Sequence, residues 1–496
     1  MKKSKKKFML AGLVLLAITM VLLPLSGCKN DSVPETPETP KYRVTFDVGV
    51  NSEATAPASI TVESGTELTA EQVPELSHTS SYQFMGWYLG DTKIGAGYTV
   101  TESVTVTARW QGTNLTFTAE GKQSLTTIDN GMAMPVLMEY STDGGQTWSK
   151  LSPATAISFG NGTKLYLRAK SSIGTAENSN AYLGFQFGTE VKVACSGDIR
   201  TLVDYTNPTG ADTSNARFCY LFKDCSQLIQ APELPAETLA DRCYYGMFYG
   251  CTSLTQAPEL PAKALAGYCY YDMFSGCTGL TQAPELPAET LADDCYMYMF
   301  NGCTGLTQAP ELPAETLDNE CYVNMFSGCT GLTQAPELPA ETLADSCYLY
   351  MFNGCTGLTQ APKLPAKALA DKCYSSMFDG CTSLTVAPEL EATALAPKCY
   401  EAMFIRCTGL TQAPELPATA LASECYQHMF YGCENLKSVT MLAKTNVNAY
   451  NALYQWLDGT AEGGTLYVAS GMEANEKITG SLPTDKNWKV EVAATN

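Results

Sequence analysis

The sequence has few of the residues on which catalytic sites usually depend. Its 496 residues include only two histidines, His78 and His428, which lie far apart in the chain. It has no GxSxG nucleophile motif, no HExxH zinc motif and no glycine-rich phosphate loop. Its carboxylates fall at repeated positions and not as one isolated pair. We therefore expect no enzymatic activity, no catalytic residue and no cofactor.

Positive charge is also scarce. Lys and Arg together number 31 against 51 Asp and Glu, and the formal net charge is −20. A cationic groove for nucleic acid is therefore unsupported. The charge favours solubility and partners that are basic or bridged by cations.

An apolar run from Phe8 to Leu23 follows the basic start MKKSKKK and precedes Leu25-Ser26-Gly27-Cys28. It is too short for a stable membrane anchor and predicts a signal peptide. The LSGC sequence resembles the bacterial lipobox, which implies a lipoprotein signal peptide over residues 1–27 and lipid attachment at Cys28. Lys29-Asn30-Asp31 resembles the lysine-plus-acidic tag of some surface-exposed lipoproteins. Together the two resemblances imply a bacterial outer-membrane protein that is lipid-anchored and exposed at the surface. An ordinary signal peptide is the alternative.

The rest of the chain is dominated by a repeat of 26 residues, written most plainly from Leu280 to Gly305 as LTQAPELPAETLADDCYMYMFNGCTG. A fixed period of this length is typical of a solenoid, in which each unit covers the apolar face of its neighbour. The opening leucine recurs at nine positions: Leu228, Leu254, Leu280, Leu306, Leu332, Leu358, Leu384, Leu410 and Leu436.

Within the unit, LTQA predicts a short strand, and the proline after it limits strand pairing. Apolar residues then recur every four positions and predict a helix of about three turns: Leu291, Cys295, Met299 and Cys303. Asn301-Gly302 would end that helix. We expect an α/β solenoid, leucine-rich-repeat-like, of 26-residue strand–helix units over residues 217–440, preceded by two small β domains.

The core of the unit, M-F-x-G-C-T-x-L-T, resembles the BspA-type (Treponema pallidum-type) leucine-rich repeat of bacterial surface proteins, in a longer variant. The resemblance covers roughly Arg217 to Thr440. It implies a surface lipoprotein or adhesin, and it names no ligand.

Comparison of the units separates fixed from variable positions. The Cys-Tyr pair, the Met-Phe pair and the second cysteine barely change, as expected of an inward face. The position two residues after the first cysteine varies and is expected to face solvent. Its first six members, from Leu221 to Leu349, are apolar, and contiguous exposed apolar area usually marks an interaction site. The candidate binding residues are five of them: Tyr245, Tyr271, Met297, Val323 and Leu349. Partial burial against the neighbouring unit is the alternative. The next column varies too and includes Tyr298, Tyr350 and His428.

A further column is acidic, with Glu233 and Glu259 as its first members and Lys363 as its one interruption. A solvated, edge-protecting face is the favoured interpretation, and bound cations are the alternative. The column that contains Gln256 and Gln282 predicts a hydrogen-bonded side-chain ladder.

Of the 20 cysteines, eighteen form nine repeat pairs, and Cys28 and Cys195 stand apart. Most pairs are eight residues apart, as Cys243 and Cys251 are. Eight helical residues span about 12 Å, whereas a disulfide needs Cα atoms within about 7 Å. We therefore expect buried thiols, with intra-repeat disulfides as the alternative, and no zinc.

Four segments flank the repeats. Residues 28–41 contain VPETPETP and predict an extended tether. Residues 42–111 resemble the internalin B-repeat (Listeria–Bacteroides repeat), a β-grasp-like module, through FMGWY at 84–88 and the closing ARW at 108–110. Residues 112–216 predict a β domain that caps the first repeat. Residues 441–496 predict a C-terminal cap with a helical pattern from Tyr450 to Leu457 and strands near 464–468 and 488–492.

The β domain over residues 112–216 also contains an Asp-box pattern, S-x-D-x-G-x-T-W, from Ser141 to Trp148. Such a box is a hairpin-turn device and not a catalytic site. It occurs once here, where a propeller would repeat it. We therefore expect it to be structural.

Together these features predict a cell-surface lipoprotein whose repeats bind a protein on a host or microbial surface, in the manner of an adhesin. Two alternatives remain open. The solenoid is instead a carbohydrate-binding module for nutrient capture, with exposed tyrosines as sugar-stacking platforms, or it is a structural spacer without a ligand.

Overall fold

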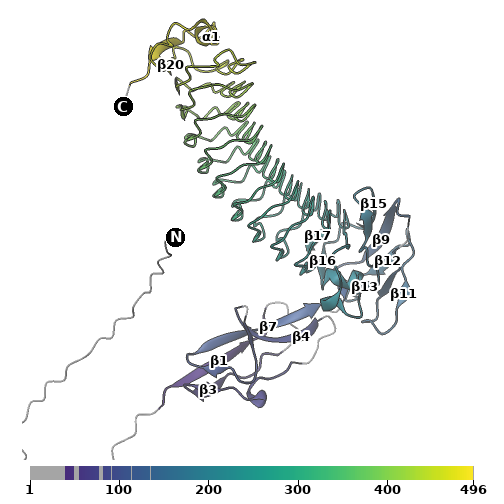
Figure 1. Ribbon diagram of the computed structural model, residues 1–496. Helices are drawn as coiled ribbons and strands as arrows, with labels where there is room; N and C mark the ends of the chain where they lie inside the picture. The colour runs from purple at the N-terminus through teal and green to yellow at the C-terminus, as the bar shows by residue number, and fades with distance from the viewer. Residues whose placement is uncertain are drawn as a thin grey trace, which may run out of the picture.

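The computed structural model describes residues 39–49, 55–76, 82–90, 92–112, 114–133 and 136–494. The signal peptide, Cys28 and nearly all of the tether lie outside the described residues. The described part consists of a β module, a β-sandwich, an array of stacked coils and a C-terminal cap (Figure 1).

The first module is a five-stranded mixed sheet with the order β2-β1-β7-β4-β5. Its first and last long strands, β1 (Lys41–Asp47) and β7 (Val104–Gly112), pair in parallel at the centre. Trp87 fills a core of its own, where its ring meets those of Phe46 and Phe84 and its indole N–H donates to the Pro74 carbonyl. The remaining elements are β2 (Ile60–Glu63), β3 (Thr66–Glu67), η1 (Ala70–Gln72), β4 (Tyr82–Leu89), β5 (Thr92–Ile94) and β6 (Thr99–Val100).

The β-sandwich is built from two sheets with the orders β11-β10-β13-β8-β16-β17 and β12-β9-β15-β14. Strand β16 (Val193–Ser196) pairs in parallel with β17 (Leu228–Gln230), which belongs to the first repeat. One continuous core therefore runs from the sandwich into the array. The other strands are β8 (Leu115–Thr118), β9 (Gln123–Asn130), β10 (Met138–Ser141), β11 (Ser149–Lys150), β12 (Ile157–Phe159), β13 (Leu165–Ala169), β14 (Ala176–Asn178) and β15 (Ala181–Phe187). Two short 3-10 turns, η2 (Ile199–Leu202) and η3 (Pro208–Gly210), lead into the array.

The stretch predicted as a helix in each repeat is a run of tight turns. Residues 217–440, all of them described, contain no helix. The expected α/β solenoid with helices is therefore wrong, and the fold is a repeated β-rich one. Its backbone N–H groups alternate in direction: Cys243 donates to Ala240 in its own coil (3.0 Å), whereas Tyr244 donates to Cys269 in the next coil (2.9 Å).

Each run of turns depends on left-handed backbone at every fourth residue. In the fourth coil, which contains Cys295, these residues are Asp294, Tyr298 and Gly302, with φ of 54°, 58° and 69°. A left-handed residue reverses the local path of the chain, so three of them fold the segment into flat, successive corners. This pattern explains the apolar spacing of four without a helix.

The fixed columns point inward, as predicted. Cys243, Tyr244, Met247, Phe248 and Cys251 are each at most 1% exposed. Because equivalent residues lie one above another, their rings form continuous stacks. The centroids of Phe248 and Phe274, for example, are 5.6 Å apart with planes 5° from parallel.

All 20 cysteines except Cys28 lie in the described residues, and each is free and buried. The second cysteine of a repeat donates its S–H to a carbonyl of the preceding coil, as Cys303 does to Phe274 at 3.1 Å. The structure thus has the buried thiols that were expected. Burial raises the pKa of the Cys303 thiol well above its usual value.

On the opposite edge of each coil, strand pairing shrinks to isolated bridges. Gln256 pairs with Gln282 and Thr238 with Ala264, all in parallel. The prolines nearby lack the N–H that a longer ladder would need. The expected Gln side-chain ladder is absent, because no hydrogen bond joins the amides of this described column.

The array continues one coil beyond its predicted end. Left-handed residues recur at Asn451, Gln455 and Gly459, and Tyr426 of the ninth coil donates to the carbonyl of Ala452. The helix expected from Tyr450 to Leu457 is therefore wrong. The cap closes with α1 (Glu476–Thr479) and a parallel sheet of β18 (Glu415–Leu416), β19 (Ser438–Met441), β20 (Thr465–Val468) and β21 (Lys489–Val492), which includes both predicted strands.

Candidate functional site

The variable column of the turn face is less exposed than the sequence predicts. Tyr245, Tyr271, Met297 and Leu349 are half-buried, and Val323 is buried. Leu221, in the first coil, is also buried. The expectation of a solvent-facing column is therefore wrong for Val323 and Leu221 and holds in part for the others. Neighbouring coils lie close above and below each of these side chains, so only part of each one reaches solvent.

Five tyrosines form a continuous chain of ring contacts on this face, which we name the tyrosine strip: Tyr182, Tyr220, Tyr245, Tyr271 and Tyr298. Successive centroids along the strip are 5.0, 5.3, 4.5 and 5.7 Å apart. The strip joins two columns of the array to strand β15 of the sandwich. It is the largest group of ring contacts outside the core stacks in the described residues.

The orientation of the rings decides what the strip offers. Tyr245 and Tyr271 are stacked with planes 10° from parallel, so each covers a face of the other. Tyr220 and Tyr298 meet the two ends of this pair in edge-to-face geometry, at 77° and 66°. One face of Tyr245 and one face of Tyr271 are thus used within the strip, and a partner would contact the parts of these half-buried rings that reach solvent.

Charged groups lie directly beside the strip. Lys223 places its ammonium 4.8 Å from the centre of the Tyr220 ring, a cation–π contact. Burial raises the pKa of Asp272 to about 6, against the lowering effects of a Ser275 hydrogen bond and the Lys223 charge. Burial also raises the pKa of Tyr220 to about 12, and those of Tyr245 and Tyr271 rise for the same first cause. The hydroxyls stay neutral and can both donate and accept.

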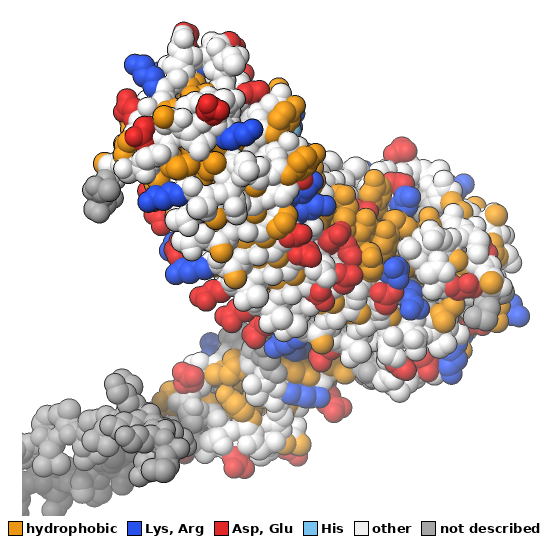
Figure 2. Space-filling view, turned by 45° about the horizontal axis from the view of Figure 1, so that its top comes forward, with side chains coloured by type: hydrophobic (Ala, Val, Ile, Leu, Met, Phe, Trp, Pro, Cys, Tyr) orange, Lys and Arg blue, Asp and Glu red, His pale blue; other side chains and the backbone are white. Residues whose placement is uncertain are grey.

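The strip lies in an apolar and acidic neighbourhood. Figure 2 shows hydrophobic side chains gathered where the coil array meets the β-sandwich, with acidic side chains beside them. Asp293, in the coil that carries Tyr298, and Glu320, in the next coil, are both exposed. Burial raises the pKa of the Tyr298 hydroxyl, and Glu320 lies near enough to raise it further. A partner of this surface would therefore need apolar contacts at its centre and positive charge at its rim.

The acidic column on the strand edge shows no metal site. Glu259, Glu285 and Glu311 are exposed. In the described part of the chain, no three His, Cys, Asp or Glu side chains come together as metal ligands would. The column is therefore a solvated face, which was the favoured interpretation.

The Asp box forms the turn between β10 and β11. Asp143 accepts hydrogen bonds from the N–H groups of Gln146 and Thr147 (3.0 Å each) and from the hydroxyl of Ser141. These bonds, that of the Thr147 side chain first, lower the pKa of Asp143. Every polar group of the motif serves the hairpin, as the turn interpretation predicts.

Three members of the strip escaped prediction as binding residues, each for a different reason. Tyr298 belongs to the second variable column, where its neighbours are polar. Tyr220 lies in the first coil, where the two cysteines are six residues apart and not eight. Counting from the first cysteine therefore does not align Tyr220 with the equivalent residues of the later coils. Tyr182 lies outside the repeats, and nothing in the sequence joins β15 to the first coil.

No protein-family model, curated protein or solved structure matches the chain. Within the described residues, no helix has both the length and the apolar character needed to span a membrane.

Proposed function

We propose that the tyrosine strip docks a protein partner, and that the chain is a lipid-anchored bacterial surface protein whose coil array presents this strip to host or microbial surfaces. The observation that carries the proposal is the chain of ring contacts from Tyr182 to Tyr298 on a half-buried surface. Tyrosine gives large contact area with few rotatable bonds, so it loses little entropy when it is buried by a partner.

Ring geometry favours a protein over a sugar at this strip. Sugars stack on open aromatic faces, but Tyr245 and Tyr271 each cover one face of the other at a centroid distance of 4.5 Å, and both rings are half-buried. Edges and hydroxyls of neutral tyrosines instead suit a mixed apolar and hydrogen-bonding protein surface. The acidic surroundings and the net charge of −20 favour a partner with basic residues at its rim.

The array supports this role by holding the strip rigid. Below the strip, the Tyr270–Tyr296 and Phe274–Phe300 stacks continue with planes 4° and 5° from parallel. Backbone bonds between coils fix the height of each tyrosine relative to the next. A preorganised surface loses less entropy on binding than a mobile one does.

The lipid anchor belongs to the same proposal and rests on the LSGC sequence alone. An outer-membrane lipoprotein with a tether of about a dozen residues would carry its array away from the membrane. Protease treatment of intact cells, with wild-type protein and with Cys28→Ser, tests this part. Cleavage of the wild-type protein at the cell surface, lost when Cys28 is replaced, is the expected result.

The docking surface is tested by Tyr245→Ser and Tyr271→Ser, because Ser375 already occupies the equivalent position two coils beyond Val323. The double variant should fold and bind protein-coated surfaces or cells more weakly. Binding that disappears after the cells are treated with protease identifies a protein partner. Unaltered binding of the double variant would remove the strip from the proposal.

A further inference from the structure

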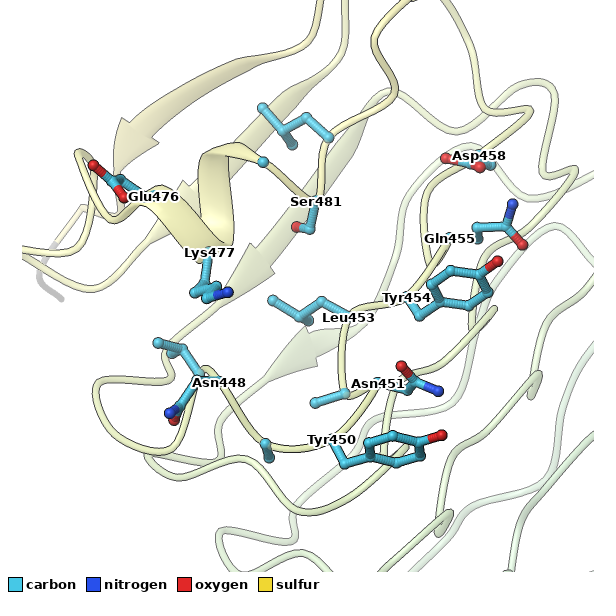
Figure 3. A pocket seen from close by; sticks show the side chains of 15 residues that line it. Asn448, Tyr450, Asn451, Leu453, Tyr454, Gln455, Asp458, Glu476, Lys477 and Ser481 are labelled. Atoms are coloured by element: carbon cyan, nitrogen blue, oxygen red, sulfur yellow. The ribbon is translucent and has the colours of Figure 1, made fainter.

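A second candidate site lies at the far end of the array. An open hollow of about 670 Å³ separates the tenth coil from α1 (Figure 3). Ligand sites in proteins are commonly about 300–1,000 Å³. Tyr450, Asn451 and Tyr454 of the tenth coil lie on one side of the hollow, and Lys477 and Ser481 come from the α1 side.

The tenth coil presents a row of backbone donors without acceptors. In the ninth coil the N–H groups of Glu424, Tyr426 and His428 donate to the tenth. The corresponding N–H groups of the tenth coil belong to Asn451, Leu453 and Gln455. In the described chain they have no hydrogen-bond partner, because no eleventh coil follows. All three residues line the hollow.

Donors predominate at this edge: among the carbonyls from Tyr450 to Gln455, only that of Leu453 has no hydrogen-bond partner in the described chain. The carbonyls of Tyr450, Ala452 and Tyr454 are turned back and accept from the ninth coil. Those of Asn451 and Gln455 accept from turns within their own coil. An extended peptide would bring its own N–H groups to the same edge as its carbonyls, and they would find the Leu453 carbonyl as their one acceptor. The edge is therefore a poor match for an added β-strand.

Side chains around the hollow add an open aromatic face and free amides. Tyr450 is 69% exposed, and no ring contact covers it among the described residues. Tyr454 is 50% exposed and meets His428 edge to face. The amides of Asn448 and Asn451 have no hydrogen-bond partner within the described chain. These amides can both donate and accept.

We propose that this hollow binds an oligosaccharide. Sugar oxygens accept from the N–H groups of Asn451, Leu453 and Gln455. A sugar hydroxyl can rotate so that its own O–H points away from these donors, and no donor then faces another donor. The open ring of Tyr450 supplies the stacking face that the tyrosine strip lacks. The amides of Asn448 and Asn451 match the donor–acceptor pairs of adjacent hydroxyls. The site is separate from the strip and does not depend on it.

Charge at the hollow is mixed, since Asp458 and Glu476 accompany Lys477. Neutral and carboxylated sugars share the oxygens that the donor row requires. The test therefore includes both kinds. Neutral glycans would rely on the N–H row and Tyr450, whereas carboxylated glycans would also use Lys477 and weaken as salt rises.

The test is binding of the full chain to an array of neutral glucans, mannans and N-acetylglucosamine oligomers, with uronic-acid and sialic-acid glycans as a second arm. Two variants probe the site. Tyr450→Ser removes the stacking face and should weaken binding about tenfold, as expected for one lost aromatic contact. Asn451→Gly removes an amide and keeps the left-handed backbone (φ 49°), so it should also weaken binding.

Tyr431→Ser is the matched control. Tyr431 is an exposed tyrosine (42%) that contacts His428 but does not line the hollow. Binding of a glycan by the wild-type chain and by Tyr431→Ser, with loss in Tyr450→Ser, supports the proposal. No bound glycan in either arm, or equal binding by Tyr450→Ser, overturns it. Loss of glycan binding in the Tyr245 and Tyr271 double variant alone would also overturn it, because it would place the sugar at the strip.

Discussion

The ring of Tyr245 lies on that of Tyr271, with centroids 4.5 Å apart and planes 10° from parallel. The two residues are 26 positions apart in sequence, and the stacking of successive coils alone brings them together. Each repeated position becomes a column of neighbours in the fold. Substitutions at one position therefore change a surface several coils long, which is how the array can present a binding face on a fixed core.

The carboxyl of Asp272 is expected to make stability depend on pH. Burial raises its folded-state pKa to about 6 from the usual 3.8. The folded protein therefore holds this proton more tightly than the unfolded chain does. The resulting stabilisation is complete below about pH 4 and is lost as the pH rises through about 6.

Asp272→Asn should therefore raise the melting temperature at pH 7.5 and leave it almost unchanged at pH 4. Asparagine also tolerates the left-handed backbone at this position (φ 55°). Asp371→Asn, an exposed acid on the same array, controls for the change in net charge. An equal effect of Asp272→Asn at both pH values would contradict the assignment.

Thiol chemistry gives a second prediction. All 20 cysteines but Cys28 are free and buried, so a thiol reagent should not react with them until the protein is unfolded. A reductant should leave the melting temperature unchanged. A large drop in melting temperature with reductant would indicate disulfides that the structure does not contain.

Substitution of Cys303 tests the hydrogen bond that its thiol donates. Cys303→Ser buries a hydroxyl, a stronger polar group, and should destabilise the protein by about 1–3 kcal/mol. Cys303→Ala loses the packing of the sulfur and also the bond to Phe274 (3.1 Å). Denaturant unfolding of both variants measures these effects. A serine variant as stable as the wild type would argue against burial at this column.

Left-handed corners give a fourth prediction. Gly302 has φ of 69°, and a Cβ there would meet only the Cα and the backbone N of Gly276, each at 3.9 Å, so space is no obstacle. Gly302→Ala should still cost about 1 kcal/mol, because alanine disfavours this backbone. Thr304→Ala, at an exposed position with ordinary backbone, serves as the control. Denaturant unfolding gives the free energies. A gain in stability would point to a helix at this segment, where alanine is favoured.

The sequence predicted the repeat and the inward columns because these follow from a fixed period and from residue type. It predicted the free thiols from the length of a helix that the segment does not form, so that prediction was right for a wrong reason. It did not predict the turns. Apolar residues four apart, as at Cys295 and Met299, fit one face of a helix of 3.6 residues per turn over a short stretch. Left-handed residues such as Asp294 and Tyr298 give the same spacing. Aspartate tolerates this backbone better than most residues, but nothing in the identity of Tyr298 marks the backbone that it adopts.

The binding surface was predicted in part for a related reason. A helix would have turned Val323 outward, whereas the stacked turns bury it at 2% exposure. Tyr182 and Tyr298 join the strip only through contacts made in the folded chain. The unpaired N–H row at Asn451 depends on where the tenth coil ends. The tenth coil keeps the left-handed residues of the repeat, although Ala452 stands where earlier coils have their first cysteine. The repeated cysteines therefore do not reveal this coil in the sequence.

The central claim is that the tyrosine strip binds a protein, and the most direct measurement compares the purified chain with its Tyr245→Ser/Tyr271→Ser variant on protein-bearing cell surfaces. The account predicts a loss of at least tenfold in affinity at an unchanged melting profile, since central aromatic residues contribute most of the energy of an interface. Glu401→Ser, in the same column but beyond the strip, should bind like the wild type. Wild-type affinity in the double variant would contradict the account.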